Sequence, residues 1–156
     1  MELVILVGVQ GSGKTTFFRE RFAATHAHVS KDNFRSNPRP ARRQRRLVAD
    51  ALAAGRSVVV DNTNPTAADR AELVALAQTA GATVACYFFP PALDASLRRN
   101  ALRGGKARVP DHAIRITAAR LEVPAPAEGF ALFHVRLVDG AGFEVVAVME
   151  GGDAAG

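Results

Sequence analysis

The chain has 156 residues, of which 48% are hydrophobic, and a formal net charge of +5. This length and composition predict one folded domain, residues 1–150, followed by a flexible tail at residues 151–156. No segment has the length of a membrane span, and the N-terminus starts with a strand-like run rather than a signal peptide. The single Cys86 excludes a disulfide framework. We therefore expect a cytoplasmic protein without disulfide-linked partners.

The positive charge comes almost entirely from arginine, because the chain has three lysines and seventeen arginines. Arginine pairs bidentately with phosphate, and a basic domain attracts polyanions. A genome that prefers arginine to lysine explains the same composition equally well. The charge alone therefore does not decide for a nucleic-acid partner.

Strand-like and helix-like segments alternate along the chain. Apolar runs predict strands at residues 3–7, 28–30, 57–61 and 82–89, and helices are expected at about 13–24, 39–54, 66–81, 92–102 and 110–121. Residues 131–138 and 143–149 are expected to form a hairpin around a glycine-containing turn at 139–142. The alternation predicts an α/β fold with a mainly parallel sheet, helices on both faces and a C-terminal β-hairpin, with ligands at the carboxyl ends of the strands.

Residues 8–15 fit the phosphate-binding pattern G-x-x-x-x-G-K-[ST], and they lie between the first expected strand and the first expected helix. The glycines allow consecutive backbone N–H groups to turn inward toward an anion. Lys14 is expected to reach the β- and γ-phosphates of a nucleoside triphosphate, and the Thr15 hydroxyl is expected to hold Mg²⁺. The α/β fold is thus predicted to be that of a P-loop NTPase or kinase.

Asp32 follows the second expected strand, in the run Ser-Lys-Asp-Asn-Phe-Arg at residues 30–35. A carboxylate at this point can accept the proton of an attacking hydroxyl during phosphoryl transfer. An aspartate after a short strand is also common as a helix N-cap or turn residue. The pattern by itself leaves both interpretations open.

Asp61 ends the third expected strand and matches a Walker B position, which orients Mg²⁺ directly or through water. The following residues, Asn62 to Asn64, also fit simple turn chemistry before Pro65. For Asp61 the phosphate loop favours the metal role.

Arginines gather at residues 98–108, on a helix end and a loop. Arg99 and Arg103 lie four residues apart and therefore share a helical face. Helix-end arginines also neutralise the helix dipole, but the glycines at 104 and 105 favour a lid that closes over the nucleotide. A second arginine run at residues 39–46 fits either a path for a polyanion or a solvated face. The four histidines show no metal-ligand spacing and are expected on the surface or in the core.

In this order, the segments resemble the kinase domain of polynucleotide 5′-hydroxyl kinases from animals and phages. The resemblance covers residues 4 to about 133 and is strongest in Asp-Asn-Thr-Asn-Pro at 61–65, Arg-Asn at 99–100, Val-Pro at 109–110 and Ala-Glu-Gly-Phe at 127–130. It implies ATP-dependent phosphorylation of a 5′-hydroxyl end of DNA or RNA, with Mg²⁺.

The resemblance also implies roles for individual residues. Asp32 matches the general base, Arg35 the arginine on the nucleic-acid phosphate beside the reacting end, and Arg103 the lid arginine on the ATP phosphates. The expected catalytic residues are Lys14, Asp32 and Arg103, the expected metal ligands are Thr15 and Asp61, and the expected substrate-binding residues are Arg35, Asn62 and Asn64. The residues expected to bind ATP are Gly8, Gln10, Gly11, Ser12, Gly13, Lys14, Thr15, Thr16, Arg99 and Arg103.

The sequence departs from the family in three ways. Lys31 stands where the family usually has arginine, residues 36–46 are fewer than in the phage counterpart, and no Asp-x-Asp-Gly-Thr phosphatase motif occurs, so a kinase module alone is expected. One alternative is a P-loop kinase that phosphorylates a small-molecule hydroxyl. A second is a nucleotide-binding module without transferase activity, which would not need Asp32 beside the acceptor.

Overall fold

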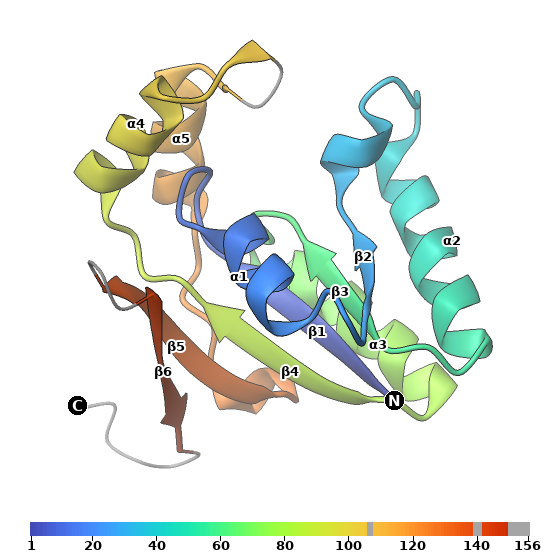
Figure 1. Ribbon diagram of the computed structural model, residues 1–156. Helices are drawn as coiled ribbons and strands as arrows, with labels where there is room; N and C mark the ends of the chain where they lie inside the picture. The colour runs from blue at the N-terminus through green and yellow to red at the C-terminus, as the bar shows by residue number, and fades with distance from the viewer. Residues whose placement is uncertain (106–107, 139–141, 150–156) are drawn as a thin grey trace.

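The structure, a computed structural model, describes residues 1–105, 108–138 and 142–149. The expected tail at 151–156, the hairpin turn at 139–141 and Lys106 of the lid run lie outside these residues. Within them, six strands form one sheet in the order β2-β3-β1-β4-β5-β6 (Figure 1). Their bounds are β1 (Glu2–Val7), β2 (Ala27–Val29), β3 (Val58–Asp61), β4 (Thr83–Phe88), β5 (Ala131–Val138) and β6 (Gly142–Val148).

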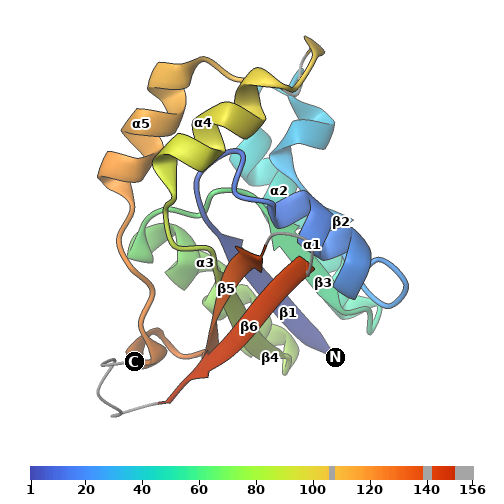
Figure 2. The ribbon, with the colours of Figure 1, turned by 60° about the vertical axis from the view of Figure 1, so that its left-hand side comes forward.

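The first five strands run parallel, and β6 pairs with β5 in the antiparallel direction. Helix α1 (Lys14–Arg21) packs on one face of the sheet, and α2 (Pro40–Ala53) and α3 (Ala67–Ala80) pack on the other. Helices α4 (Leu93–Ala101) and α5 (Asp111–Arg120) lie side by side at the end of the sheet where the parallel strands finish (Figures 1 and 2). The predicted α/β fold with a C-terminal hairpin is therefore confirmed.

Strand β1 is central, and its side chains belong alternately to two hydrophobic cores, one on each face of the sheet. Leu3 and Ile5 point to the core beneath α2 and α3, whereas Val4 and Leu6 pack with Phe17 and other aromatic residues on the α1 side. Successive side chains of a strand alternate between faces, so a strand covered on both sides is apolar throughout. This explains why the run at residues 3–7 shows no polar alternation.

Most predicted boundaries hold to within one or two residues, and the N-cap Thr66 is confirmed because its Oγ1 accepts the Asp69 N–H at 3.1 Å. The first helix is shorter than expected and ends at Arg21, where the chain turns: the Ala23 N–H donates to the Phe18 carbonyl and the His26 N–H to the carbonyl of Phe22, the residue after the helix. Ser30 is not part of the second strand. Its hydroxyl accepts the Asp32 N–H at 3.3 Å and begins the 3-10 helix η1 (Lys31–Phe34), which the sequence did not predict.

The single cysteine behaves as a small apolar residue, as expected. Cys86 is fully buried in β4, and this burial raises the pKa of its thiol to about 12. A thiol with such a pKa is not a nucleophile at neutral pH. In the described part of the chain, no helix combines the length and apolar character that crossing a membrane requires.

A buried ion pair joins two segments that are far apart in sequence. Arg70 of α3 has no exposed surface, and its Nε and Nη2 donate to the two carboxylate oxygens of Glu128 at 2.9 and 3.2 Å. Its Nη1 donates to the carbonyl of Asn64 at 3.0 Å. Glu128 lies in the short 3-10 helix η3 (Pro126–Glu128), and its carboxylate also accepts the Ala125 N–H. The end of β3 is thus tied to the segment that leads into β5.

Breaking this pair should destabilise the fold strongly. Glu128→Gln leaves the buried Arg70 charge without its carboxylate and should lower the free energy of unfolding by roughly 3–5 kcal/mol. The double variant Arg70→Met/Glu128→Leu should lose much less, because no buried charge remains. Urea unfolding followed by circular dichroism measures both.

A matched control is the exposed pair between Arg136 and Glu144. Arg136 Nη2 lies 3.2 Å from Glu144 Oε2, and the two side chains are 74% and 51% exposed. Glu144→Gln should change stability by about 0–1 kcal/mol. Equal losses for the Glu128 and Glu144 variants would contradict the role given to the buried pair.

Candidate active site

The phosphate loop connects β1 to α1 and depends on glycine at two positions. Gly11 and Gly13 have φ angles of 79° and 97°, in the left-handed region that favours glycine. A Cβ on Gly11 would lie 2.7 Å from the carbonyl oxygen of Ser96, so α4 packs directly against the loop. The Gly8 N–H donates to the Thr63 carbonyl at 3.1 Å, which fixes the start of the loop beside the end of β3.

Lys14 is folded into this loop. Its side chain donates to the carbonyls of Gly8 and Val9 at 2.9 and 2.8 Å, and the residue is 8% exposed. Burial lowers the pKa of Lys14 to about 8, with Asp61 acting against this shift and Arg103 adding to it. An anion in the loop would favour the ammonium form. A phosphate bound in the loop would therefore stabilise the charged form of Lys14.

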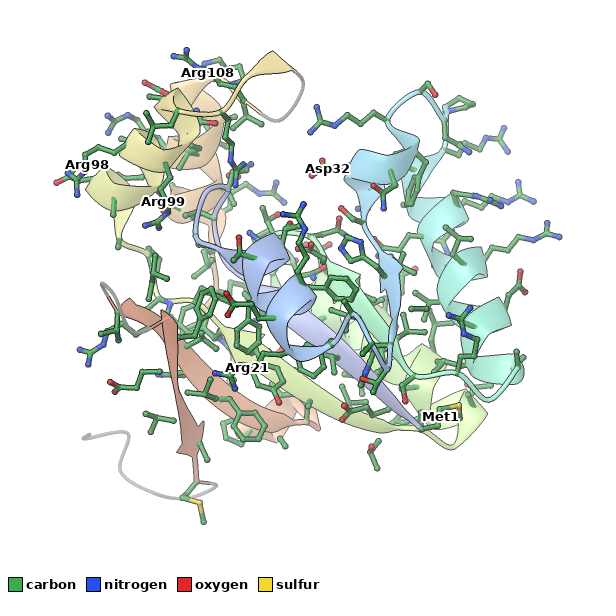
Figure 3. The ribbon with its side chains drawn as sticks, in the orientation of Figure 1. Met1, Arg21, Asp32, Arg98, Arg99 and Arg108 are labelled. Atoms are coloured by element: carbon green, nitrogen blue, oxygen red, sulfur yellow. The ribbon has the colours of Figure 1, made fainter. Side chains whose placement is uncertain are left out.

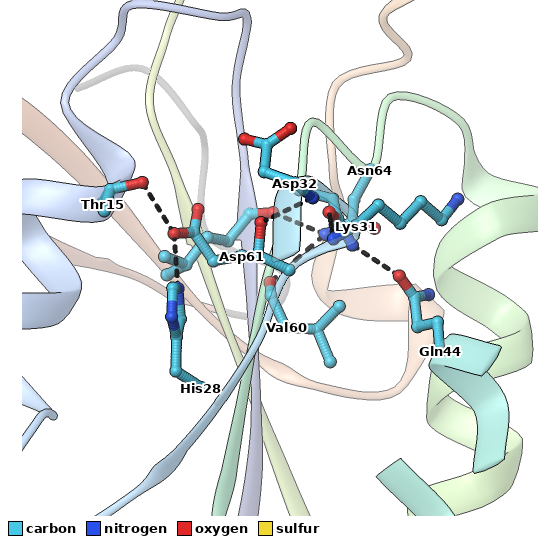
Figure 4. Close-up of polar contacts among 11 residues, drawn as sticks. Thr15, His28, Lys31, Asp32, Gln44, Val60, Asp61 and Asn64 are labelled. Atoms are coloured by element: carbon cyan, nitrogen blue, oxygen red, sulfur yellow. Dashed lines mark hydrogen bonds and ion pairs between the residues drawn. The ribbon is translucent and has the colours of Figure 1, made fainter. Parts of the chain in front are cut away.

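The two expected metal ligands are in direct contact. Thr15 Oγ1 donates to Asp61 Oδ2 at 2.8 Å, at the point where β3 ends (Figure 4). Burial alone would raise the pKa of the Asp61 carboxyl, but hydrogen bonds from His28 and Thr15 and the charge of Lys14 outweigh burial and hold the pKa below its usual range. An ionised carboxylate beside a hydroxyl oxygen fits the hard oxygen ligands that Mg²⁺ prefers.

His28 joins this pair, although nothing in the sequence marked it. Its Nε2 lies 2.8 Å from Asp61 Oδ2 (Figure 4). Its ring stacks on Phe18 with centroids 4.1 Å apart. His28, expected on the surface or in the core, is 26% exposed and contacts Asp61. The contact depends on the pairing of β2 with β3, which places His28 beside Val59, two residues before Asp61. No local pattern shows that pairing.

The expected base, Asp32, lies on η1 rather than in a loop. Its side chain is 72% exposed and points from η1 toward the side where α4 lies (Figure 3). Arg35 donates to Asp32 Oδ1 from Nη2 at 2.9 Å and from Nε at 3.3 Å. The predicted base and the predicted substrate arginine are thus brought together at the rim of the site.

A relay of amides supports η1 and fixes which way each amide faces. The Lys31 N–H donates to Asn62 Oδ1 at 2.9 Å, and Asn62 Nδ2 donates to Gln44 Oε1 (Figure 4). Because a backbone N–H can only donate, the oxygen of Asn62 must face Lys31 and the oxygen of Gln44 must face Asn62. Gln44 is 8% exposed, and its NH₂ group remains as a hydrogen-bond donor in the wall of the cavity. Nothing in the sequence distinguishes Gln44 from the run of arginines around it.

Asn64 also has a structural role. Its side chain is 6% exposed and donates to the Leu6 carbonyl at 2.8 Å, and its own carbonyl accepts from Arg70. Its φ of 44° lies in the left-handed region. These contacts make Asn64 a brace between β1 and β3. Asn64 also lines the cavity, and its role as a substrate ligand stays a prediction.

The structure also shows where the arginines at the start of α2 lie. The exposed residues Arg39, Arg42, Arg43 and Arg46 share the face opposite the buried Val48. Arg45 pairs with Glu72 at 2.9 Å. Of the two interpretations left open by the sequence, this geometry favours a solvated face.

Helices α4 and α5 hold the other side of the phosphate loop. Arg99 Nε donates to the Gly11 carbonyl, and burial lowers the pKa of Arg99, with the charges of Arg103 and Arg98 adding to the shift. The buried Asn100 accepts the Val109 N–H at 2.9 Å and donates to the Val109 carbonyl, so the two segments of the family resemblance meet here. Gln10 Nε2 reaches Thr117 of α5 at 3.2 Å. Helices α4 and α5, from which the expected lid extends, are therefore hydrogen-bonded to the phosphate loop.

A cavity of about 340 Å³ joins most of the predicted site residues. Those that line it are Gln10, Gly11, Lys14, Thr15, Asp32, Arg35, Asp61, Asn62, Asn64 and Arg103. Ser12 and Arg99 instead line a second hollow of about 670 Å³ between α4 and the end of β5. Thr16 is exposed on α1, and its contact with ATP stays a prediction.

Comparison with known proteins gives a relative that is similar in sequence and several solved structures that have a similar fold. The bifunctional polynucleotide phosphatase/kinase of Schizosaccharomyces pombe is 26% identical over 133 residues, which cover 83% of this chain and 32% of that protein. The chain thus spans about a third of that relative's length. A fungal RNA kinase has a TM-score of 0.66 at 16% identity, covering 88% of this chain and 76% of that one. A gluconokinase from Sinorhizobium meliloti 1021 has a TM-score of 0.60 at 18% identity, covering 85% and 82%.

The profile of a protein family described as AAA domain matches residues 3–124, which is most of the chain. The match includes the phosphate loop, Asp32, Asp61 and the arginines of α4. The fold around them is that of P-loop kinases, which bind a nucleotide at this loop. The chain belongs to this AAA domain family.

Proposed function

We propose that the protein is an ATP-dependent kinase that transfers the γ-phosphate to the 5′-hydroxyl end of DNA or RNA. The observation that carries the proposal is the shared cavity, in which Lys14 of the phosphate loop, Asp32 of η1 and Arg103 from beyond α4 face one space. The likeness to the Schizosaccharomyces pombe phosphatase/kinase over 83% of the chain supports a polynucleotide acceptor.

The donor side follows from the phosphate loop. The backbone N–H groups and Lys14 bind the β- and γ-phosphates of ATP, in place of the carbonyl contacts that Lys14 makes now. Thr15 and Asp61 would hold Mg²⁺, which neutralises charge on these phosphates when it is bound. Arg103 adds positive charge from the opposite wall, next to Lys14.

The acceptor side follows from η1 and its supports. The attacking hydroxyl loses its proton to a carboxylate oxygen of Asp32 as its oxygen bonds to the γ-phosphorus and the bond to the ADP oxygen breaks. Arg35, which lines the cavity beside Asp32, would bind the phosphate beside the reacting end, and Gln44 would offer its NH₂ group to an acceptor oxygen. Asn62 and Lys31 keep Gln44 in this orientation.

A second candidate, a kinase for a small-molecule hydroxyl, is favoured by one feature of the cavity. Asp69 and Glu72 line it together with Arg35, and Glu72 is paired with Arg45. The negative charge of Asp69 would repel a polyanionic backbone. A salt titration separates the two acceptors. The KM for a polynucleotide should rise steeply with ionic strength, whereas the KM for a neutral small acceptor should change little.

The direct test uses γ-labelled ATP and Mg²⁺ with 5′-hydroxyl DNA and RNA oligonucleotides and a panel of sugars and nucleosides. We expect label on the oligonucleotides and none on the same oligonucleotides that already carry a 5′-phosphate. Label confined to a small molecule would move the assignment to the second candidate.

Asp32→Asn should abolish transfer without weakening nucleotide binding. The amide keeps the shape of the side chain but cannot take the proton, so the single-turnover rate should fall by about 10²–10⁴-fold. The dissociation constant for ATP, measured by calorimetry, should stay unchanged. Asn33→Ala, an exposed neighbour on the same 3-10 helix, is the matched control and should keep the wild-type rate. An active Asp32→Asn variant would refute the assignment of the base.

A further inference from the structure

We infer that His28 is a positioning residue that holds the Asp61 carboxylate in the orientation needed for the metal–nucleotide complex. This inference concerns the nucleotide side alone and stands whichever acceptor the enzyme uses. It begins from the 2.8 Å contact between His28 Nε2 and Asp61 Oδ2.

Both hydrogen bonds to Asp61 end on the same oxygen. Thr15 Oγ1 and His28 Nε2 each lie 2.8 Å from Oδ2, and the described residues provide no hydrogen bond to Oδ1. Two donors on Oδ2 fix the rotation of the carboxylate and leave the lone pairs of Oδ1 for a ligand in the cavity. The Thr15 hydroxyl can keep donating its proton to Asp61 while its lone pairs face a cation.

The ring of His28 is itself held in place. It stacks on Phe18 of α1 with an interplanar angle of 21°, and its side chain is 26% exposed. His28 therefore ties β2 and α1 to the end of β3, on the same side of the sheet as Phe18 and Val59. A donor on such a fixed ring limits the carboxylate more than a donor on a flexible chain would.

Asp61 needs these donors because it is almost completely buried, at 4% exposure. A buried carboxylate with an unmet hydrogen-bond requirement is costly and turns toward other donors. Without His28, one alternative partner is the Lys14 ammonium, whose charge already acts on Asp61. A carboxylate drawn toward Lys14 would leave the place where Thr15 now meets it. Groups behind a metal ligand commonly change metal affinity by about 10–100-fold.

Two substitutions separate the donor from the ring. His28→Phe keeps the stacking on Phe18 but removes the N–H, whereas His28→Gln keeps an N–H donor but removes the ring. Phe22→Leu, at the residue that follows α1 and in the same hydrophobic cluster as Phe18, is the control for general loosening of this packing.

The first readout is nucleotide binding by calorimetry, with and without Mg²⁺. For His28→Phe we expect the gain in ATP affinity caused by Mg²⁺ to fall by about tenfold or more, with the affinity for metal-free ATP unchanged. His28→Gln should restore most of the gain. In phosphate transfer, the Mg²⁺ concentration for half-maximal rate should rise in parallel for His28→Phe.

The second readout is the unfolding of the protein without nucleotide or metal. His28→Phe should be less stable than His28→Gln in urea, because the buried Asp61 loses a donor. Equal Mg²⁺ dependence in His28→Phe and wild type would overturn the inference, and so would an equal loss of ATP affinity with and without Mg²⁺. Absence of label on every acceptor would refute the proposed function and would leave the calorimetric result valid.

Discussion

The buried guanidinium of Arg70 is the interaction on which the geometry of the site depends. It binds Glu128 with two nitrogens and the Asn64 carbonyl with the third. Asn64 in turn donates to the Leu6 carbonyl at the end of β1, and the neighbouring Thr63 accepts from Gly8. The pairing of β1 with β3 places Asp61 beside Leu6, and this ion pair braces the segment that follows β3 against the start of the phosphate loop.

Oppositely charged side chains in the cavity stabilise each other's ionised forms. Asp61 favours the ammonium form of Lys14, and Lys14 favours the ionised form of Asp61. In the structure Lys14 satisfies its donors with loop carbonyls, a neutral arrangement that phosphate oxygens can replace. Arg99 and Arg103 come from the opposite side, where α4 is packed against Gly11. The nucleotide side is therefore preorganised before any ligand binds.

The proposed acceptor side is built differently. Asp32 is exposed on a short 3-10 helix, and its support comes from Asn62 and Gln44, which lie on two other elements. Carboxylates of α3 share the same wall with Arg35. The fold is shared with both an RNA kinase and a gluconokinase, so the fold by itself does not determine the acceptor.

The sequence by itself determined the order of strands and helices, the phosphate loop, and the identity of Asp32 and Asp61 as polar residues at strand ends. These features are local, because a hydrophobic period, a glycine spacing or a residue after a strand can be recognised without knowing what lies beside it. Only the tertiary structure decided that His28 faces Asp61, that Gln44 presents a donor, that Asn64 is a brace and that the arginines of α2 face away from the cavity. Each of these depends on which strand lies beside which and on where a helix face points after packing. Such pairings are fixed by burial of the whole core, so no short stretch of sequence contains them.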